Sequence, residues 1–258
     1  MAKGKDEDAI HQAAEMIALA VRGRKPLVVL TGAGISAESG VPTFRGPEGL
    51  WQGFRPEELA TPAAFARDPE RVWQWYHWRR QRVAAAEPNA GHRALVALEA
   101  VLDDAFTLLT QNVDGLHRRA GSQRVVELHG NLYRARCTRC QGSAAIPDTA
   151  EGLVFCPDCG SLSRPDVVWF GERLPEQAWR RAVDAVENAS VMLVVGTSGV
   201  VQPAAGLVEL AAARGVSIVE VNPQRSALTD LARCFIGEKA GVALPRLLAR
   251  AGLDPASG

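Results

Sequence analysis

The stretch that decides the fold is Leu27-Val28-Val29-Leu30-Thr31-Gly32-Ala33-Gly34-Ile35-Ser36-Ala37. It opens with a short apolar run, which is typical of a strand buried in a parallel sheet. Gly32 and Gly34 follow at once, and Ala37 fills the small third position of a Gly-x-Gly-x-x-Gly/Ala phosphate loop. The N–H groups of the next helix start would then face a pyrophosphate. The stretch therefore predicts a strand followed by a dinucleotide-binding loop.

The residues after this loop differ from those of an ordinary dehydrogenase. An acidic residue usually follows about 20 residues further on, whereas Gln52 occupies that region here. The run from Glu38 to Gly46 contains glycine and proline, which a regular helix does not tolerate. We therefore expect a loop that carries Phe44 and Arg45. Glycines after a strand often make only a turn, so the assignment depends on the rest of the chain.

Length and charge limit the possible functions. The chain has 258 residues, with 29 basic and 29 acidic side chains, so it suits one large domain with a small satellite. Zero net charge disfavours a nucleic-acid partner and an anionic membrane. The first eight residues are charged and contain no apolar h-region, and the apolar runs are too short to cross a bilayer. We expect a soluble, monomeric protein of the cytoplasm.

Four cysteines form the strongest metal signal. Cys137 and Cys140 make one Cys-x-x-Cys pair, and Cys156 and Cys159 make a second one after fifteen intervening residues. Each pair can form one knuckle, and four thiolates complete a closed tetrahedral site. We therefore predict one structural Zn²⁺ and a reducing compartment; the alternatives are two disulfides or a redox pair. Cys234 is interpreted as a buried apolar thiol.

The segment 47–87 shows no strand pattern, and we interpret it as a helical insertion. It is rich in arginine and holds seven of the fifteen aromatic residues, namely Trp51, Phe54, Phe65, Trp73, Trp75, Tyr76 and Trp78. Tyr76 and Arg79 are three residues apart and would share one face of a helix. A phenol and a guanidinium can jointly bind a carboxylate. The alternative is a Tyr76 packed among aromatics and a solvated Arg79.

Strands and helices alternate again after the insertion, as in an α/β fold. The expected strands are 106–110, 125–128, 191–195 and 216–221. Gln111, Asn112 and Asp114 follow the first of these strands, at the edge where parallel sheets bind ligands. Amide and carboxylate groups there can bind a ribose and a carboxamide, but Asn and Asp are also common helix caps.

Polar or small residues follow the other strands as well. His129 comes after the second strand, and a pKa near 6.5 suits a general base at neutral pH. An isolated histidine is nevertheless more often structural. Gly196-Thr197-Ser198 after the third strand is a second small-residue loop. Asn222 could bind ribose hydroxyls or could be a turn residue before Pro223.

These motifs resemble the sirtuins, the NAD-dependent protein-lysine deacylases. The resemblance rests on Gly-Ala-Gly-Ile-Ser at 32–36, Gly-Val-Pro-Thr-Phe-Arg at 40–45, Gln-Asn-x-Asp-x-Leu-His at 111–117, His-Gly at 129–130 and the four cysteines. It runs from about Leu27 to Leu248. It implies an α/β fold with a doubly wound, Rossmann-like NAD-binding core made of residues 9–46, 88–130 and 164–248. A small domain would combine the helices of 47–87 with a zinc ribbon at 131–163.

The resemblance also implies roles for individual residues. His129 is the expected catalytic base, and NAD is consumed as a co-substrate. The residues expected to bind NAD are Gly32, Ala33, Gly34, Ile35, Ala37, Thr43, Phe44, Arg45, Trp51, Gln111, Asn112, Asp114, Gly196, Thr197, Ser198, Asn222 and Ala240. The edge at Val168, Phe170 and Gly171 would pair with the substrate peptide by strand addition; alternatively it is a core strand that ends in a turn.

The implied reaction removes acyl groups from protein lysines and gives nicotinamide and O-acyl-ADP-ribose. In class III sirtuins a Tyr-x-x-Arg motif binds succinyl- or malonyl-lysine, and Tyr76 and Arg79 resemble it. Pro47 and Glu48 depart from the small residues common in that class. The alternatives are a protein mono-ADP-ribosyltransferase, a hydride-transferring dehydrogenase and a non-catalytic NAD-binding zinc module.

Overall fold

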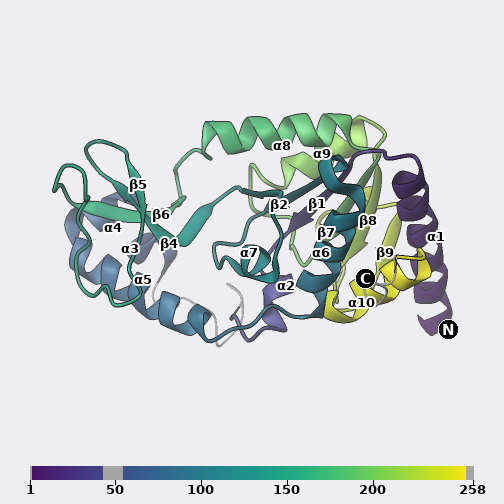
Figure 1. Ribbon diagram of the computed structural model, residues 1–258, viewed down its shortest axis with the longest axis horizontal. Coiled ribbons are helices and arrows are strands. Elements are labelled where there is room, and N and C mark those ends of the chain that lie inside the picture. The colour runs from purple at the N-terminus through teal and green to yellow at the C-terminus, as the bar shows by residue number, and fades with distance from the viewer. Residues whose placement is uncertain (1, 43–54, 254–258) are drawn as a thin grey trace.

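The computed structural model describes residues 2–42 and 55–253, and in this part of the chain the strands form two separate sheets. The larger sheet has the order β3-β2-β1-β7-β8-β9, and the smaller has the order β5-β4-β6. They lie towards opposite ends of an elongated molecule (Figure 1). The strands are β1 Leu27–Thr31, β2 Phe106–Thr110, β3 Val125–Glu127, β4 Gly130–Cys137, β5 Ser143–Ala145, β6 Ser163–Val167, β7 Val191–Val195, β8 Ser217–Val221 and β9 Cys234–Ile236.

Helices and short 3-10 turns connect these strands. The helices are α1 Ala2–Arg22, α2 Gly34–Ala37, α3 Pro56–Leu59, α4 Pro62–Arg67, α5 Pro69–Ala84, α6 Ala90–Leu102, α7 Leu116–Ala120, α8 Glu176–Asn188, α9 Gly206–Ala213 and α10 Ala240–Arg250. None of the helices in the described ranges combines the length and the apolar character that a membrane span requires.

The larger sheet is parallel throughout and has the predicted doubly wound order. β1 lies at its centre, with β2 on one side and β7 on the other. The strand order reverses between β1 and β7, which is the point where such sheets bind their ligands. Every residue of β1 and of β7 is buried, as their apolar runs predict.

Helices cover both faces of this sheet. Alternate residues of a strand point to opposite faces, so Val29 packs with α1, α6 and α10 whereas Val28 packs with α8 and α9. Figure 1 shows α8 and α9 along one side of the strands and α6 and α10 along the other. Two apolar layers therefore hold the larger sheet.

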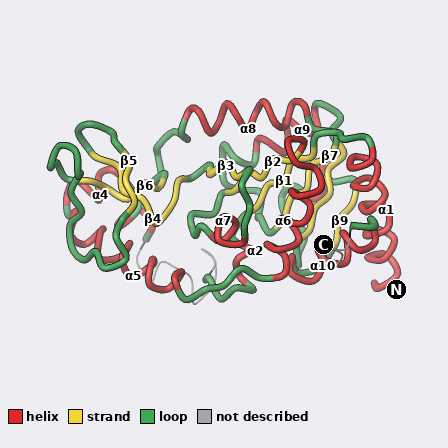
Figure 2. The backbone as a smooth tube through the Cα atoms, in the orientation of Figure 1, coloured by secondary structure: helices red, strands yellow, loops and turns green. Residues whose placement is uncertain are grey.

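The smaller sheet packs against α3, α4 and α5, which confirms the predicted helical character of the insertion within residues 55–84. Figure 2 shows these helices beside the short strands β4, β5 and β6. Their shared core is rich in large side chains, including Leu59, Trp73, Tyr76 and Trp169. This region therefore has its own apolar cluster, separate from the two layers that cover the larger sheet.

Several boundaries differ from the expected ones. β4 begins at Gly130 and β6 ends at Val167, so both strands that border the zinc module extend beyond the expected limits of 131 and 163. The chain was expected to return to the larger sheet at Arg164, but it does so only after β6. Proline is common at the first position of a helix, so the sequence predicts a helix that starts at Pro203. The helix begins instead at Gly206, because residues 202–205 form turns. The division of the chain into two domains stays a prediction.

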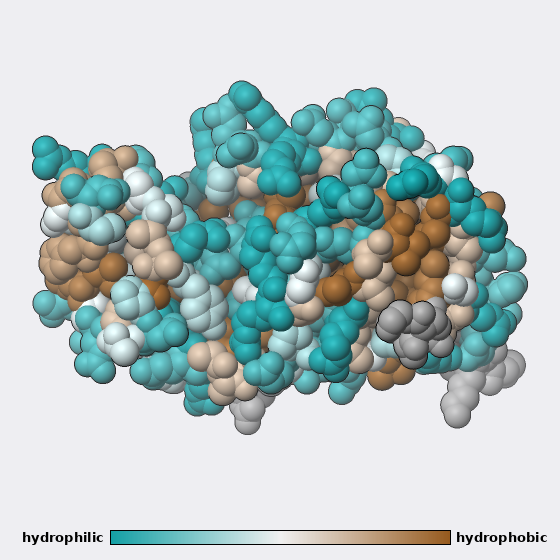
Figure 3. Space-filling model, in the orientation of Figure 1, coloured by the Kyte–Doolittle hydropathy of each residue, from teal (hydrophilic) through white to brown (hydrophobic). Residues whose placement is uncertain are grey.

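The surface is mainly hydrophilic on the face drawn in Figure 3, with apolar areas at both ends of the molecule. Large apolar side chains that remain exposed include Leu19, Val101, Phe155 and Phe170.

Candidate active site

Two glycine loops meet where the strand order reverses. The Gly32 N–H donates to the Val195 carbonyl (3.0 Å), and the Gly34 N–H donates to the Gly196 carbonyl (2.8 Å). A Cβ on Gly34 would lie 2.7 Å from the Gly196 Cα, and one on Gly196, whose φ is +61°, would lie 2.5 Å from the Ile35 nitrogen. Side chains are therefore excluded, and the two loops form the kind of bare backbone cradle that a pyrophosphate requires.

Polar side chains from two strand ends converge on Thr197, which lies in the second loop, after a third strand, β7. The Gln111 amide donates to the Thr197 hydroxyl (3.1 Å), and the Asn222 amide donates to the Thr197 carbonyl (2.9 Å). Gln111 follows β2 and Asn222 follows β8. Residues predicted to bind the ribose groups are thus brought together although they are far apart in sequence.

Ala240 lies at the start of α10, next to the first glycine loop. The N–H of the following residue, Gly241, donates to the Glu38 carboxylate (3.0 Å), just after α2. Ser198 lies in the second loop, and its carbonyl accepts from the Ala227 N–H. Both predicted residues therefore lie on segments that border the cradle.

Ser36 joins Asn112 and Asp114, two residues of the 111–117 motif whose side chains could bind a carboxamide. Its hydroxyl donates to Asp114 (2.7 Å), and the Asn112 amide lies 3.2 Å from the same hydroxyl and 3.1 Å from the Gly32 carbonyl. The other Asp114 oxygen accepts from the Leu116 N–H and so caps α7. Burial raises the pKa of Asp114. Asp114 therefore caps a helix and also belongs to the candidate site.

His129 has a fixed orientation and a defined tautomer. Its Nδ1 lies 3.0 Å from the Gln111 carbonyl, and because a carbonyl can only accept, the neutral ring carries its proton on Nδ1. The Nε2 atom is then a proton acceptor. Burial lowers the pKa of His129 below its usual 6.5, although the bond to Gln111 opposes this shift. The ring is therefore neutral at pH 7, as a general base requires.

The backbone beside His129 is equally constrained. Gly130 has a φ of +82°, and a Cβ there would lie 2.0 Å from the Asp166 carbonyl oxygen. The His129 carbonyl accepts from the Val168 N–H (2.9 Å), and Glu127 accepts from the Asn131 amide (2.7 Å). The candidate base thus lies at the junction between β3 of the larger sheet and β4 of the smaller one.

Two other histidines are structural. His92 on α6 is fully buried, and its Nδ1 accepts from the Asn89 N–H. His117 on α7 is 2% exposed, and its Nε2 lies 2.9 Å from the Thr31 hydroxyl. Burial lowers the pKa of His92 to about 4 and that of His117 to about 3. These contacts favour His129 as the base.

Tyr76 and Arg79 share the buried face of α5, where they are 1% and 3% exposed. The Tyr76 hydroxyl accepts from the Trp169 indole N–H (2.8 Å). The Arg79 Cζ lies 4.7 Å from the Trp75 ring centroid and 5.4 Å from the Tyr76 ring centroid. The alternative of a solvated Arg79 is therefore wrong, because neighbouring rings cover the guanidinium. Tyr76 does pack among aromatics, as its alternative predicted.

Burial and two neighbouring side chains have opposite effects on the pKa of Arg79. Burial lowers the pKa of Arg79, whereas the nearby Tyr76 and Asp114 raise it. Burial also raises the pKa of Tyr76, so the phenol keeps its proton. Asp114, which is predicted to bind NAD, therefore acts on the pKa of Arg79 together with Tyr76.

The expected peptide edge follows β6. The Val168 N–H is bonded to His129, and the Phe170 N–H donates to the Ala60 carbonyl (3.0 Å). Phe170 is 56% exposed, and Gly171 turns the chain with a φ of +84°. The segment thus connects the candidate base to an exposed aromatic side chain.

The four predicted cysteines form one cluster. The Cys137 and Cys159 sulfurs are 3.5 Å apart, the Cys140 and Cys156 sulfurs are 3.6 Å apart, and all four lie within 4.8 Å of one another. These separations are too long for disulfide bonds of about 2.05 Å. They fit four thiolates at about 2.3 Å from one tetrahedral Zn²⁺. With no ligand position left for water, the zinc site is structural.

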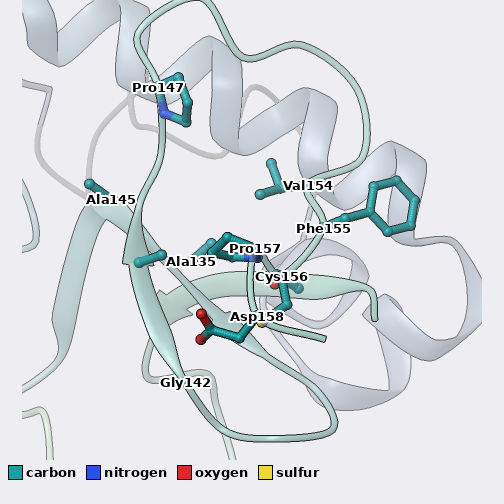
Figure 4. A pocket seen from close by; sticks show the side chains of 11 residues that line it. Ala135, Gly142, Ala145, Pro147, Val154, Phe155, Cys156, Pro157 and Asp158 are labelled. Carbon is teal, nitrogen blue, oxygen red and sulfur yellow. The ribbon is translucent and has the colours of Figure 1, made fainter. Parts of the chain in front are cut away.

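A cavity of about 180 Å³ lies beside this cluster (Figure 4). Its lining is mainly apolar, and Phe155 points away from the other labelled side chains. Apart from Cys156, the described residues that line it include none of those predicted for zinc, NAD or substrate. The cavity is therefore distinct from the candidate active site.

Some predicted residues lie outside the described ranges, and some contacts escaped prediction. Thr43, Phe44, Arg45 and Trp51 lie outside, as do Pro47 and Glu48.

The sequence interpretation assigned no role to Ser36, Asn89 or Trp169. The Asn89 amide donates to the Ile35 carbonyl (2.7 Å) and thereby holds α2. Ser36 could have been predicted as a site residue, because it lies within the motif of the first glycine loop.

Comparison with known proteins gives a consistent result. The model of the Sir2 family matches residues 32–203. The "NAD-dependent protein deacylase 2" of Pyrobaculum aerophilum is 57% identical over 223 residues, which cover 86% of this chain and 89% of that protein. An "NAD-dependent protein deacylase" of Thermus thermophilus is 54% identical over 237 residues, which cover 91% of this chain and 93% of that protein.

Solved structures are similar over the same extent. A crystal structure of a Sir2 homologue with NAD superposes with a TM-score of 0.86 at 49% identity and covers 93% of both chains. A Sir2 complex with a deacetylated p53 peptide and 3′-O-acetyl ADP ribose has a TM-score of 0.75 at 35% identity, covering 87% of this chain and 92% of that one.

Proposed function

Because this chain belongs to the Sir2 family and is an NAD-dependent protein deacylase, we propose that its substrates include acyl-lysines whose acyl group ends in a carboxylate. NAD is the co-substrate, and one Zn²⁺ is structural. Bound NAD supplies the ribose carbon that takes the acyl oxygen as nicotinamide departs. One water molecule is consumed as the amine leaves, and the products are free lysine, nicotinamide and O-acyl-ADP-ribose.

His129 acts as the general base in this proposal. Its Nε2 accepts a proton from a ribose hydroxyl, while the Gln111 carbonyl holds Nδ1. The lowered pKa keeps the ring ready to accept this proton at neutral pH. The bond between the His129 carbonyl and the Val168 N–H couples the base to the edge that binds the peptide.

The other polar groups position the dinucleotide. Asn112 and Asp114 bind the nicotinamide carboxamide, and Ser36 holds both of them in place. The backbone cradle of Gly32, Gly34 and Gly196 binds the pyrophosphate. Thr197 and Asn222, together with Ala240, lie around the adenosine. These assignments rest on the polar contacts that join the strand ends.

One observation carries the acidic acyl preference: the Tyr76 oxygen has donor groups as neighbours. The Trp169 indole donates to the phenol oxygen, and the Arg79 Cζ lies 5.4 Å from the Tyr76 ring centroid. An indole and a guanidinium can only donate. Burial also keeps the phenol protonated. The phenol hydrogen and the guanidinium N–H groups therefore suit an incoming acceptor with negative charge. A terminal carboxylate fits this set of donors better than a methyl group does.

The test compares three lysine peptides of one sequence with NAD in excess: acetyl, succinyl and the neutral amide analogue of succinyl. The variant is Arg79→Met, and its matched control is Arg82→Met, an exposed arginine of the same helix. A hydrogen bond to a charged group contributes about 1.5–3 kcal/mol. We expect Arg79→Met to lower kcat/KM for succinyl-lysine by about 10–150-fold relative to the amide.

Equal losses for all three peptides, or no loss, would contradict the carboxylate preference and leave a deacylase whose Tyr76 and Arg79 are structural. Mass spectrometry of the peptide checks the reaction class in the same samples, since deacylation removes the acyl mass and ADP-ribosyl transfer adds mass.

We extend the proposal to partners and location. The Sir2 complex with a deacetylated p53 peptide supports acylated-lysine proteins as substrates. Zero net charge supports a protein that binds neither nucleic acid nor a membrane surface. The two cysteine pairs support a reducing compartment, and we propose a monomer in the cytoplasm.

A further inference from the structure

Trp169 is hydrogen bonded to the side chain that we assign to acyl recognition. Its indole N–H lies 2.8 Å from the Tyr76 hydroxyl, although the two residues are 93 positions apart. Trp169 is 3% exposed and Tyr76 is 1% exposed. An indole has one donor and no acceptor, so the phenol oxygen must accept this bond. The phenol hydrogen is then directed to another acceptor.

We propose that Trp169 is a positioning residue for acyl specificity: its N–H fixes the Tyr76 oxygen and turns the phenol hydrogen towards the acyl carboxylate. The inference rests on the proposed function, because it assumes that Tyr76 binds the acyl group. It adds a residue that acts through Tyr76 and that carries no charge of its own.

The indole is itself held rigidly. The Arg164 Cζ lies 3.4 Å from the Trp169 ring centroid, so the guanidinium stacks on the ring. Arg164 donates to Glu172 (2.9 Å) and to the Val167 carbonyl (2.7 Å). Glu172 also accepts from the Trp169 backbone N–H (2.8 Å). A fixed indole can hold the phenol in one rotamer, which lowers the entropy cost of binding.

Trp169 also lies in the segment that we assign to the peptide. Val168 and Phe170 flank it, and the N–H groups of both are bonded within the chain. The centroids of Trp169 and Phe65 are 5.4 Å apart, so the ring packs against α4 as well. Trp169 thus connects the backbone edge that we assign to the peptide with the Tyr76 phenol that we assign to the acyl carboxylate.

The experiment is a double-mutant cycle with Trp169→Phe, Tyr76→Phe and the double variant. Phenylalanine keeps an aromatic ring and removes the N–H donor. The measured quantity is kcat/KM for the succinyl peptide divided by that for its neutral amide analogue. We expect Trp169→Phe to lower this ratio by about three- to tenfold, mainly through KM, and to have almost no further effect when Tyr76 is already Phe.

Thermal unfolding and turnover of the acetyl peptide establish that each variant is folded. If Trp169→Phe fails this check, Trp169→His keeps a ring N–H in a smaller ring, and we expect it to retain more of the ratio than Trp169→Leu does.

Additive effects in the cycle, or equal losses for the charged and neutral peptides, would show that Trp169 only packs and would overturn the inference. A ratio that Tyr76→Phe lowers and Trp169→Phe leaves unchanged would overturn the inference and keep the proposed function. A ratio that neither Tyr76→Phe nor Arg79→Met changes would overturn both.

Discussion

The larger and the smaller sheet are stabilised by different kinds of interaction. In the larger one, five-residue strands such as β1 and β7 are buried along their whole length, and apolar helices cover both faces. In the smaller one, β5 has only three residues, none of them fully buried. Its stability comes from four thiolates, large aromatic rings and specific polar bonds. Loss of one thiolate, ring or polar bond should therefore destabilise the region of the smaller sheet far more than loss of one apolar side chain destabilises the larger sheet.

Buried charge follows the same division. Arg79, Arg80 and Arg164 are all less than a tenth exposed, and all three lie around the smaller sheet and its helices. Around the larger sheet, the buried titratable groups include His92 and His117, whose lowered pKa values keep them neutral at pH 7. The comparison teaches that buried positive charge is concentrated in the region assigned to the substrate, whereas the buried acidic residues Glu99, Asp114 and Glu220 lie around the larger sheet.

Removal of zinc should produce the largest difference between the two regions. Cys156→Ala or a chelator is expected to abolish deacylation, because a structural zinc site contributes folding free energy directly. Hydrogen exchange should show loss of protection in β4 and β6 while β1 and β7 stay protected. The control is Cys234→Ala, a buried thiol outside the cluster. Simultaneous loss of protection in both sheets would mean that they unfold as one unit.

Acid should weaken the larger region selectively. An unfolded histidine has a pKa near 6.5, and burial lowers those of His92 and His117 to about 4 and about 3. Below pH 6.5 the unfolded chain therefore binds protons that the native state does not, so stability falls as pH falls. By linkage the loss between pH 7 and pH 5 is about 3–4 kcal/mol for the pair.

Denaturant unfolding at several pH values measures this slope. His117→Gln should reduce it, since the amide does not titrate and can still bond Thr31. An unchanged slope in His117→Gln would refute the assignment.

A smaller effect, on stability and not on acyl preference, is expected for Arg80, the neighbour of Arg79 on α5. Arg80 donates to the Ile146 carbonyl (3.3 Å) and to the Pro147 carbonyl (3.0 Å), and so ties α5 to the zinc module. Arg80→Met should cost about 1–3 kcal/mol and lower Tm by a few degrees in a thermal scan. The succinyl-to-amide ratio should stay close to wild type, in contrast to Arg79→Met. A drop in the ratio would show that the two arginines do not have separate roles.

The sequence predicted the larger sheet well because its signal is local. The bounds expected for β1, β2 and β7 agree with the structure, since an apolar run between breakers identifies a buried strand. The start of α9 was wrong by three residues, because Pro203 is compatible with a helix start but also with the turns that the chain forms. The four cysteines were predicted from spacing alone, and their clustering confirms it.

Contacts between distant segments could not be predicted in the same way. Helical spacing showed that Tyr76 and Arg79 share a face, but not that α5 buries this face against Trp169. The hydroxyl of Ser36 meets Asp114 across 78 positions. Such pairs depend on how the layers pack, which residue periodicity does not encode.

The contact between the two glycine loops also determines when the cradle can form during synthesis of the chain on the ribosome. Gly34 needs the carbonyl of Gly196, and β1 needs β7 beside it. At ordinary elongation rates, about 10–30 s pass between translation of the first loop and of the second. During that interval a nascent chain carries half of a nucleotide cradle. If the cradle binds NAD as we propose, we expect NAD binding and turnover only after about three quarters of the polypeptide has been made.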